Sequence, residues 1–314
     1  MRAGAGWLAR RGSSGGAVWI IVLAVVVVLM VGHGSAFLAP QNLAALLSAS
    51  VVLGLVSIGE MIVILTAGID LSVGSLASLT CVLAAGLIAG RSALAIPILL
   101  LILALGAAIG VFHGFLVTKL RLAPFIVTLS TYFILEGVGF GYTTVPIGSM
   151  PAWVTNFYFS QIGPVPWIFV ILLAIGLGLG LVLSRSRYGR HLYAVGGDRV
   201  VARSAGINVT RVIILAYVIS GILAAFAGYL LAAQAGTGVP SSGSGLELSA
   251  IAAVVVGGTS LAGGRGHLIG MAGGVALLSL VQNAFQVLAI SGFYQGVVRG
   301  VVILAAVAIF SQKD

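Results

Sequence analysis

Charged side chains are scarce in this sequence, and their scarcity decides its class. Only 7% of the 314 residues are Asp, Glu, Lys or Arg, whereas 60% are hydrophobic and the mean hydropathy is +1.23. A soluble domain carries about 25% charged residues. Lipid is therefore the solvent expected for most of the chain. Cys81 is the one cysteine, so no intrachain disulfide can form, and it lies in an apolar run.

Motifs for nucleotide and metal binding are also missing. The only lysines are Lys119 and Lys313, and neither stands in a G-x-x-x-x-G-K-[ST] phosphate-binding loop, so the chain cannot bind ATP in that manner itself. The histidines lack partners at metal-ligand spacing; they are His33, His113, His191 and His267. We expect no metal site, no cofactor bound by this chain, no catalytic residue and no enzymatic activity.

Long apolar runs are what the chain has instead. A helix needs about 20 residues to cross about 30 Å of hydrocarbon. On that measure the sequence predicts an all-α polytopic membrane protein of about ten transmembrane helices, some of them broken by glycine or half-length. The expected spans are 18–38, 43–67, 72–90, 93–117, 124–143, 165–183, 212–233, 246–262, 267–290 and 293–311.

The first apolar run has the look of a signal peptide, with arginines before it. Further apolar segments follow it rather than a soluble domain, which favours an uncleaved first helix. We therefore expect a cytoplasmic N-terminal tail over residues 1–17 and a single transmembrane domain over residues 18–314.

The basic residues predict the orientation. With the N-terminus inside, thirteen of the 15 Lys and Arg residues fall on the cytoplasmic side, as the positive-inside rule requires. Both termini are then cytoplasmic, and the net charge of +9 needs no nucleic-acid partner. The outer loop 144–164 has no Lys or Arg and several aromatic residues, so it is either a lid or docking surface for an external partner or a plain connector.

One long polar segment interrupts the apolar chain. Residues 185–211 carry six arginines and a single acid, Asp198. We predict that residues 184–211 form a cytoplasmic loop on which a soluble partner docks; alternatively, the arginines serve only to fix the topology.

Ionisable side chains inside the expected spans are candidates for function. Such groups cost about 2.5–3.5 kcal/mol at mid-helix, so they are retained for a reason. Glu60, Glu136 and Arg299 are the three that stand out. Glu136 and Arg299 form a buried charge pair or, alternatively, line a solute path.

Two glycine-containing stretches predict breaks in the helices. In residues 64–80, Gly68 and Gly74 flank Asp70 and Ser72. Broken helices are tolerated in a membrane only where they face protein or a water-filled cavity. We favour capping and a tight turn as the role of Asp70, with direct solute contact as the alternative.

A second break is expected over residues 257–266, GGTSLAGGRG, which match residues 68–75 only at Gly, Leu and Gly. An inverted repeat would place the two breaks on opposite sides of the membrane. The expected topology places both near the cytoplasm, so either they are unrelated or one span is misdrawn.

Glycines also repeat at alternate positions within two apolar runs. These residues are Gly137, Gly139 and Gly141, and Gly176, Gly178 and Gly180. Because no strand precedes them, they do not form a nucleotide-binding fingerprint. We expect them to let helices pack closely.

Five segments in combination resemble one family. They are VILTAGIDLSVGS (63–75), PFIVTLST (124–131), YGRHLYAVGGDRVVARSAGIN (188–208), LELSAIAAVVVGGTSLAGGRG (246–266) and YQGVVRGVVILAAVA (294–308). The residues of these segments, and their order along the chain, are similar to those of the membrane permeases of ribose-type ABC sugar importers. The resemblance implies a bacterial inner-membrane protein with ten spans that works with two cytoplasmic ATPase domains, a periplasmic sugar-binding protein and a second permease copy.

The resemblance also assigns a role to the cytoplasmic loop. Residues 196–208 resemble the family's coupling element, a short helix that sits in a groove of the ATPase. The residues implied in this contact are Gly196, Gly197, Asp198, Ala202 and Gly206. ATP and Mg²⁺ would be bound by the partner ATPase.

Three positions depart from the family pattern. Asp198 stands where Asn is usual, and Ser249 stands where Asp is frequent. Glu136 stands where an Arg is expected, so the fifth span departs from the family pattern in the sign of its charge.

The expected function is that of a permease subunit that translocates a monosaccharide by alternating access. Sugar hydroxyls need hydrogen-bonding groups, so we list as path candidates Glu60, Asp70, Ser72, Thr259, Ser260, Gln282 and Asn283. The alternatives are an ion-driven secondary transporter with a proton site at Glu60 or Glu136, a structural membrane scaffold, and an ABC permease for a non-sugar polar solute. The partner permease is either an identical or a paralogous chain.

Overall fold

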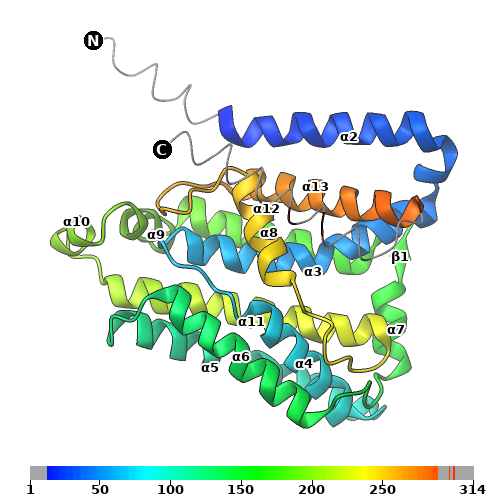
Figure 1. Ribbon diagram of the computed structural model, residues 1–314, viewed down its shortest axis with the longest axis horizontal. Coiled ribbons are helices and arrows are strands. Elements are labelled where there is room, and N and C mark those ends of the chain that lie inside the picture. Colours follow the sequence, from blue (N-terminus) through cyan, green and yellow to red (C-terminus); the bar gives the residue numbers. More distant parts are fainter. Residues whose placement is uncertain (1–12, 289–296, 298–299, 301–314) are drawn as a thin grey trace.

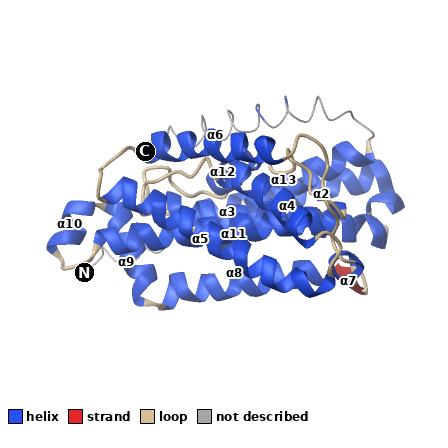
Figure 2. Ribbon diagram, turned by 90° about the horizontal axis from the view of Figure 1, so that it is seen from below, coloured by secondary structure: helices blue, strands red, loops and turns tan. Residues whose placement is uncertain are grey.

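The computed structural model describes residues 13–288, 297 and 300, and this part of the chain is built from helices (Figure 2). The helices are α2 (Ser13–Phe37), α3 (Pro40–Ile64), α4 (Val73–Ile88), η1 (Ser92–Leu94), α5 (Ala95–Thr118), α6 (Pro124–Tyr142), α7 (Ala152–Phe159), α8 (Trp167–Arg185), α9 (Arg187–Gly197), α10 (Arg199–Ser204), α11 (Val209–Ala235), α12 (Leu246–Val256) and α13 (Leu268–Val287). The described strands are β1 (Gln161–Ile162) and β2 (Val165–Pro166), which pair in a small antiparallel hairpin. The predicted all-α class is confirmed.

Within the described residues, the helices long enough to cross a membrane are fewer than the ten spans expected from the sequence. Within the described residues, six helices are long and apolar enough to cross a membrane, and they include α3, α5, α6, α8, α11 and α13. Three shorter apolar helices cover Val18–Val31, Val73–Ile88 and Leu246–Val256. The tenth expected span, 293–311, lies mostly outside the described residues. The structure thus confirms a polytopic helical protein but not the count of ten.

Helices α3 and α11 form the centre of the bundle. In the most apolar 18-residue stretch of each helix, 83% of the residues of α3 and 67% of those of α11 are buried. The corresponding shares are 22% in Ser92–Thr118, which contains α5, and 17% in α8. The long helices run along the longest axis of the molecule (Figure 1). Helices α9 and α10 lie at one end of the bundle, here called the α10 end. Helix α7 and strand β1 lie at the opposite end, the α7 end.

The most extensive helix contact is that of α5 with α11, and glycines of α5 lie in it. Gly106, Gly110 and Gly114 repeat at intervals of four and therefore share one face of α5. A Cβ at Gly110 would overlap the backbone of Tyr217, and one at Gly106 would overlap that of Gly221. Small residues at such contacts let helix backbones approach closely.

The glycine repeats singled out in the sequence are not used in this way. A Cβ at Gly137, Gly141 or Gly178 would meet no atom of the described chain within 4 Å. Gly139 and Gly176 would only reach side chains at 4.0 and 3.8 Å. A Cβ at Gly180 would lie 3.1 Å from Leu268 Cδ2, so Gly180 makes a tight contact within the described chain. The prediction of close packing is therefore wrong for Gly137, Gly141 and Gly178.

Two short helices, α4 and α12, are each preceded by a non-helical segment. Residues 65–72 connect α3 to α4, and residues 236–245 connect α11 to α12. The first segment starts at the α10 end, where Leu65 O accepts a hydrogen bond from Gly264 N at 3.1 Å. The second starts at the α7 end, where Gly238 forms an antiparallel bridge with Ile147.

The two short helices meet at their N-termini. Gly74 in the first turn of α4 lies against Glu247 in the first turn of α12, where an added Cβ would overlap the Glu247 carboxylate. Gly243 N also donates to Ser78 Oγ at 2.9 Å. Segments that enter from opposite ends and lead to half-length helices are the arrangement expected of an inverted repeat.

This pairing corrects the sequence-based comparison of the breaks. The counterpart of residues 65–72 is the segment 236–245, not residues 257–266. The hydrogen bond between Gly264 N and Leu65 O places the break at 257–266 beside the break at 65–72, at the same end of the bundle. That common position agrees with the expected topology, which assigned both breaks to one side.

Candidate functional site

The segment 65–72 is the structural centre of the candidate site. Ala67 has a positive φ of 58°, and Gly68 passes so close to Tyr217 that a Cβ would lie 2.8 Å from its hydroxyl. A side chain at position 68 would collide there. These two residues turn the chain back from the α10 end toward the interior, where α4 begins.

Asp70 anchors the end of this segment. Its Oδ1 accepts hydrogen bonds from Ser72 N at 3.1 Å and from Ser72 Oγ at 2.6 Å, and its Oδ2 accepts one from Ser220 Oγ of α11 at 3.0 Å. The amide of Ser72 precedes α4 directly, and no side chain caps the first helical amides. Asp70 therefore forms the expected tight turn before α4, whereas the prediction that its side chain caps the helix is wrong.

The backbone of the segment is held by three helices. Glu60 Oε1 of α3 accepts from Asp70 N at 3.1 Å. Ile69 O accepts from Thr128 Oγ1 of α6 at 3.2 Å and from the Tyr217 hydroxyl of α11 at 3.4 Å. Non-helical backbone inside a membrane protein requires such partners, since lipid provides none.

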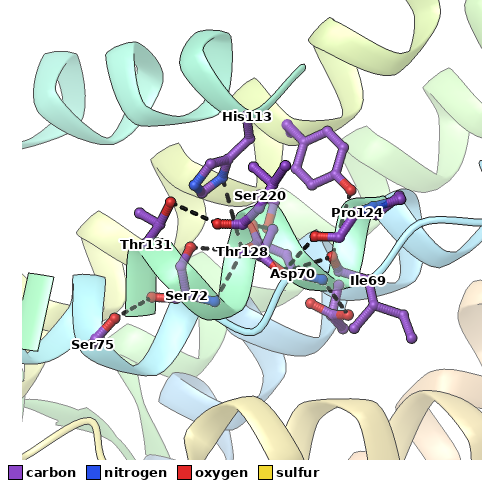
Figure 3. Close-up of polar contacts among 12 residues, drawn as sticks. Ile69, Asp70, Ser72, Ser75, His113, Pro124, Thr128, Thr131 and Ser220 are labelled. Atoms are coloured by element: carbon purple, nitrogen blue, oxygen red, sulfur yellow. Dashed lines mark hydrogen bonds and ion pairs between the residues drawn. The ribbon is translucent and has the colours of Figure 1, made fainter. Parts of the chain in front are cut away.

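His113 of α5 completes the cluster. Figure 3 shows its imidazole and the Ser220 side chain near Asp70. His113 Nδ1 lies 4.0 Å from Asp70 Oδ1, and the imidazole meets the Tyr217 ring edge-on, with centroids 5.8 Å apart. Sequence reasoning missed His113 because it has no ligand-type neighbour along the chain. Its place inside an apolar span was the available signal.

Glu247 and Ser249 mark the second half-helix. Glu247 is buried, and its Oε1 accepts from Gly245 N at 3.2 Å. Ser249 Oγ donates to Gly245 O at 2.7 Å. A carboxylate near a helix N-terminus is stabilised by the helix dipole, and Asp70 and Glu247 stand near the N-termini of α4 and α12. Glu247 was also overlooked in the sequence, although it fell inside an expected span.

The remaining path candidates do not join this cluster. Thr259 and Ser260 lie in the turn at the α10 end, where Ser260 N donates to Arg265 O at 2.9 Å. Gln282 is exposed on α13. Asn283 exchanges hydrogen bonds of 2.8 and 3.3 Å with Asn42 of α3, so its amide links two helices. The structure therefore brings together only Glu60, Asp70 and Ser72 of the predicted path residues.

Glu136 lies away from the cluster as well. It is half-buried on α6, and its Oε1 accepts from the Tyr132 hydroxyl at 3.2 Å. Arg299 lies outside the described residues, so the expected pair of Glu136 and Arg299 stays a prediction. Within the described residues, no group of three or more His, Cys, Asp or Glu side chains is placed to hold a metal ion.

The loop between α8 and α11 folds into two short helices. Asp198 caps α10, because its Oδ1 accepts from Val200 N at 2.7 Å and from Val201 N at 3.0 Å. Gly206 has a φ of +79°, which ends the segment in a left-handed turn. The expected short helix between Gly197 and Gly206 is present as α10.

The exposed face of α10 differs from the one expected. Ala202 is 3% exposed, so its side chain packs within this chain and offers no surface for close approach by a partner. Val200 and Val201 are 75% and 64% exposed instead. Apolar side chains on an otherwise polar helix are a surface suited to a partner protein. Sequence reasoning passed over both valines because it followed the small residues.

The same loop touches both breaks at the α10 end. A Cβ at Gly196 would overlap Leu65 O and would lie 2.5 Å from Gly264 N. The Arg199 guanidinium donates to Thr66 O at 2.9 Å. Tyr193 of α9 donates to Gly266 O at 2.9 Å. The end of α9 is thus seated against segment 65–72 and the turn at 257–266, with no room for a side chain at Gly196.

The chain is similar in sequence to known membrane permeases. Residues 42–307 match the family described as branched-chain amino acid transport system / permease component. The ribose import permease RbsC of Bacillus subtilis (strain 168) is 38% identical over 306 residues, covering 94% of this chain and 91% of that protein. No solved structure gives a significant match.

Two further relatives are similar over shorter lengths. The ribose import permease RbsC of Escherichia coli (strain K12) is 40% identical over 223 residues, which cover 68% of each protein. The D-allose transport system permease AlsC of the same strain is 36% identical over 207 residues, 65% of this chain and 63% of that protein. The chain therefore belongs to the family of permease components of branched-chain amino acid transport systems, whose members are inner-membrane subunits of bacterial ABC importers.

Proposed function

We propose that this chain is the membrane-spanning subunit of an ATP-driven importer that translocates a monosaccharide, ribose or a related pentose or hexose. The observation that carries the proposal is the 38% identity to a ribose import permease over 94% of the chain. A separate ATPase subunit binds ATP and Mg²⁺, and an extracytoplasmic binding protein delivers the sugar. The chain crosses the membrane ten times with both termini in the cytoplasm, and it pairs with an identical or paralogous permease.

The coupling route starts at the exposed tip of the loop. Val200 and Val201 dock on the ATPase, while Gly196 and Arg199 contact Leu65 O and Thr66 O. A displacement of α9 and α10 on ATP binding therefore acts directly on segment 65–72. That segment in turn is bonded to α3, α6 and α11 through Asp70 and Ile69.

The outer route is the counterpart at the α7 end. Gly238 pairs with Ile147, and Thr237 Oγ1 donates to Ile147 O at 3.0 Å and to Gly148 O at 3.1 Å. Docking of a loaded binding protein on the loop 143–166 therefore acts on segment 236–245. The sugar passes beside the meeting point of α4 and α12, where Ser72, Ser78 and Ser220 offer hydroxyl groups.

Uptake by proteoliposomes tests this function. The permease, reconstituted with its co-purified ATPase and with the sugar-binding protein outside, should accumulate labelled ribose or a related sugar only when ATP is present inside. Branched-chain amino acids and other sugars serve as competitors, and they identify a non-sugar solute if they displace the label. Uptake by the permease alone, driven by a proton gradient, would contradict the proposal and favour an ion-coupled transporter with a proton site at Glu60 or Glu136.

A further inference from the structure

Three ionisable side chains from three parts of the fold meet in the interior. Glu60 comes from α3, Asp70 from segment 65–72 and His113 from α5, and each is at most 1% exposed. In the described part of the chain, the one basic side chain within 4.0 Å of either carboxylate is His113, whose Nδ1 lies 4.0 Å from Asp70 Oδ1 and carries a charge only when the imidazole is protonated. That distance is too long for a hydrogen bond.

The two carboxylates have different surroundings. Asp70 accepts three hydrogen bonds, from Ser72 N, Ser72 Oγ and Ser220 Oγ, which is the environment of an ionised carboxylate. Glu60 accepts one, from Asp70 N to its Oε1. Its Oε2 is buried and has no hydrogen-bond partner among the described residues. An ionised Glu60 would therefore leave half of its charge unsatisfied beside the anion of Asp70.

Among residues 13–288, the groups packed around the cluster do not supply the missing positive charge. Thr128 of α6 and Ser72 before α4 are neutral, Tyr217 of α11 donates to Ile69 O, and Glu247 of α12 adds a further acid beyond Gly74. The Arg199 guanidinium is directed to Thr66 O. The nitrogens of His113 have no hydrogen-bond partner among the described residues. Burying two like charges in this setting costs roughly several kcal/mol for each ion. Protonation of one of the two carboxylates removes this cost for that group.

We propose that Glu60 is a proton-binding site: its Oε2 carries a proton in the arrangement seen here, while Asp70 stays ionised. The carboxylic acid releases this proton to water when the interior opens, leaving a carboxylate and a hydrated proton. The resulting anion repels Asp70 and draws water to Glu60. Because Asp70 N donates to Glu60 Oε1, proton occupancy is linked to the position of segment 65–72 and, through Thr66 O, to residues 184–211, here called the coupling loop.

This site differs from that of a proton-driven transporter. The proton here is a ligand that favours one arrangement of segment 65–72, and the energy for transport comes from ATP. Its presence is measurable in the resting permease without any transport assay, so failure of this proposal and failure of the proposed function are distinguishable.

Infrared spectroscopy of the full-length permease in lipid tests the proposal. The chain has three glutamates, Glu60, Glu136 and Glu247, so labelling with [δ-13C]glutamate shifts only their bands. At neutral pH the labelled protein should show the C=O stretch of a buried protonated carboxylic acid, and this band should disappear in Glu60→Gln. The band should persist in Glu136→Gln and Glu247→Gln, and strongly alkaline pH should remove it from the wild type.

The same measurement can overturn the proposal in two ways. A wild-type spectrum without a protonated glutamate band at neutral pH contradicts it, and this result requires no variant to fold. A band that survives in Glu60→Gln but disappears in Glu136→Gln or Glu247→Gln places the proton elsewhere and contradicts it as well. Glu60→Asp, which keeps a titratable group, should retain a protonated carboxylic acid band that no longer shifts with the glutamate label.

Discussion

Segments 65–72 and 236–245 occupy mirrored positions but differ in burial and charge. Each follows a central helix, α3 or α11, and leads into a half-length helix whose N-terminus meets that of the other. Segment 65–72 is mostly buried and is bonded through Asp70 and Ile69 to three helices. Segment 236–245 is mostly half-buried or exposed and has no charged residue. The segment beside the coupling loop is therefore held in the interior around a buried carboxylate, whereas its counterpart is more exposed and is held by neutral hydrogen bonds of Thr237, Gly238 and Gly243.

The largest difference between the segments is expected on removal of Asp70. Asp70→Ala leaves the hydrogen-bond donors of Ser72 and Ser220 without their acceptor and removes the partner of His113. We expect the free energy of unfolding to fall by about 3–5 kcal/mol. The matched change in the other segment, Ser241→Ala, removes an exposed side chain and should alter it by less than about 0.5 kcal/mol.

Unfolding in mixed detergent micelles measures both variants. Equal effects of Asp70→Ala and Ser241→Ala would show that burial and charge do not distinguish the two segments. Segments 65–72 and 236–245 would then differ only in their positions in the fold.

The contact of the coupling loop with segment 65–72 is expected to give the next largest effect on the free energy of unfolding. A Cβ at Gly196 would overlap Leu65 O, whereas a Cβ at Gly197 would meet no atom of the described residues within 4 Å. Gly196→Ala should therefore lower the free energy of unfolding by about 1–3 kcal/mol through overpacking. Gly197→Ala should leave the isolated permease unchanged or slightly more stable, since alanine favours helix over glycine.

The two glycine variants also separate packing from ATPase coupling. In the assembled importer, Gly196→Ala should lower sugar uptake per ATP hydrolysed. If Gly197→Ala destabilises the isolated permease as much as Gly196→Ala does, the proposed close contact of Gly196 with Leu65 O is wrong. An effect of Gly197→Ala seen only with the ATPase bound would support the expected contact of Gly197 with that partner.

A smaller effect is expected in the outer segment. Thr237→Val keeps the shape of the side chain but removes the hydrogen bonds to Ile147 O and Gly148 O. A neutral hydrogen bond contributes about 0.5–1.5 kcal/mol, so a loss of that size is expected in the free energy of unfolding. Stimulation of ATP hydrolysis by the loaded binding protein should fall, while basal hydrolysis stays the same. A change in basal hydrolysis alone would contradict the assignment of this segment to the outer route.

Hydropathy predicted much of the fold. The apolar runs located α3, α5, α6, α8, α11 and α13, and the glycines around Asp70 indicated the break before α4. Segment 236–245 was missed because a polar, glycine-rich stretch looks the same whether water or protein surrounds it. Its Pro240 and four glycines read as an outer loop, and only the contacts of Gly238 and Gly243 show where it runs.

Only part of the candidate site could be predicted from the sequence, for a related reason. Asp70 and Ser72 are neighbours in sequence, so their turn could be anticipated. His113 and Ser220 reach Asp70 from helices about 40 and 150 residues away, and no local pattern joins them. The glycines of α5 were likewise indistinguishable from those of α6 and α8, since composition does not say which helix face meets a neighbour.

Hydrogen–deuterium exchange in the assembled importer tests the central claim most directly. The claim is that ATP acts on segment 65–72 through α9 and α10, whereas the binding protein acts on segment 236–245. A non-hydrolysable ATP analogue should change amide exchange in residues 65–72 and leave residues 236–245 unaltered, and the loaded binding protein should do the reverse. Unchanged exchange in residues 65–72 on nucleotide binding, with the ATPase shown to be occupied, would contradict the account.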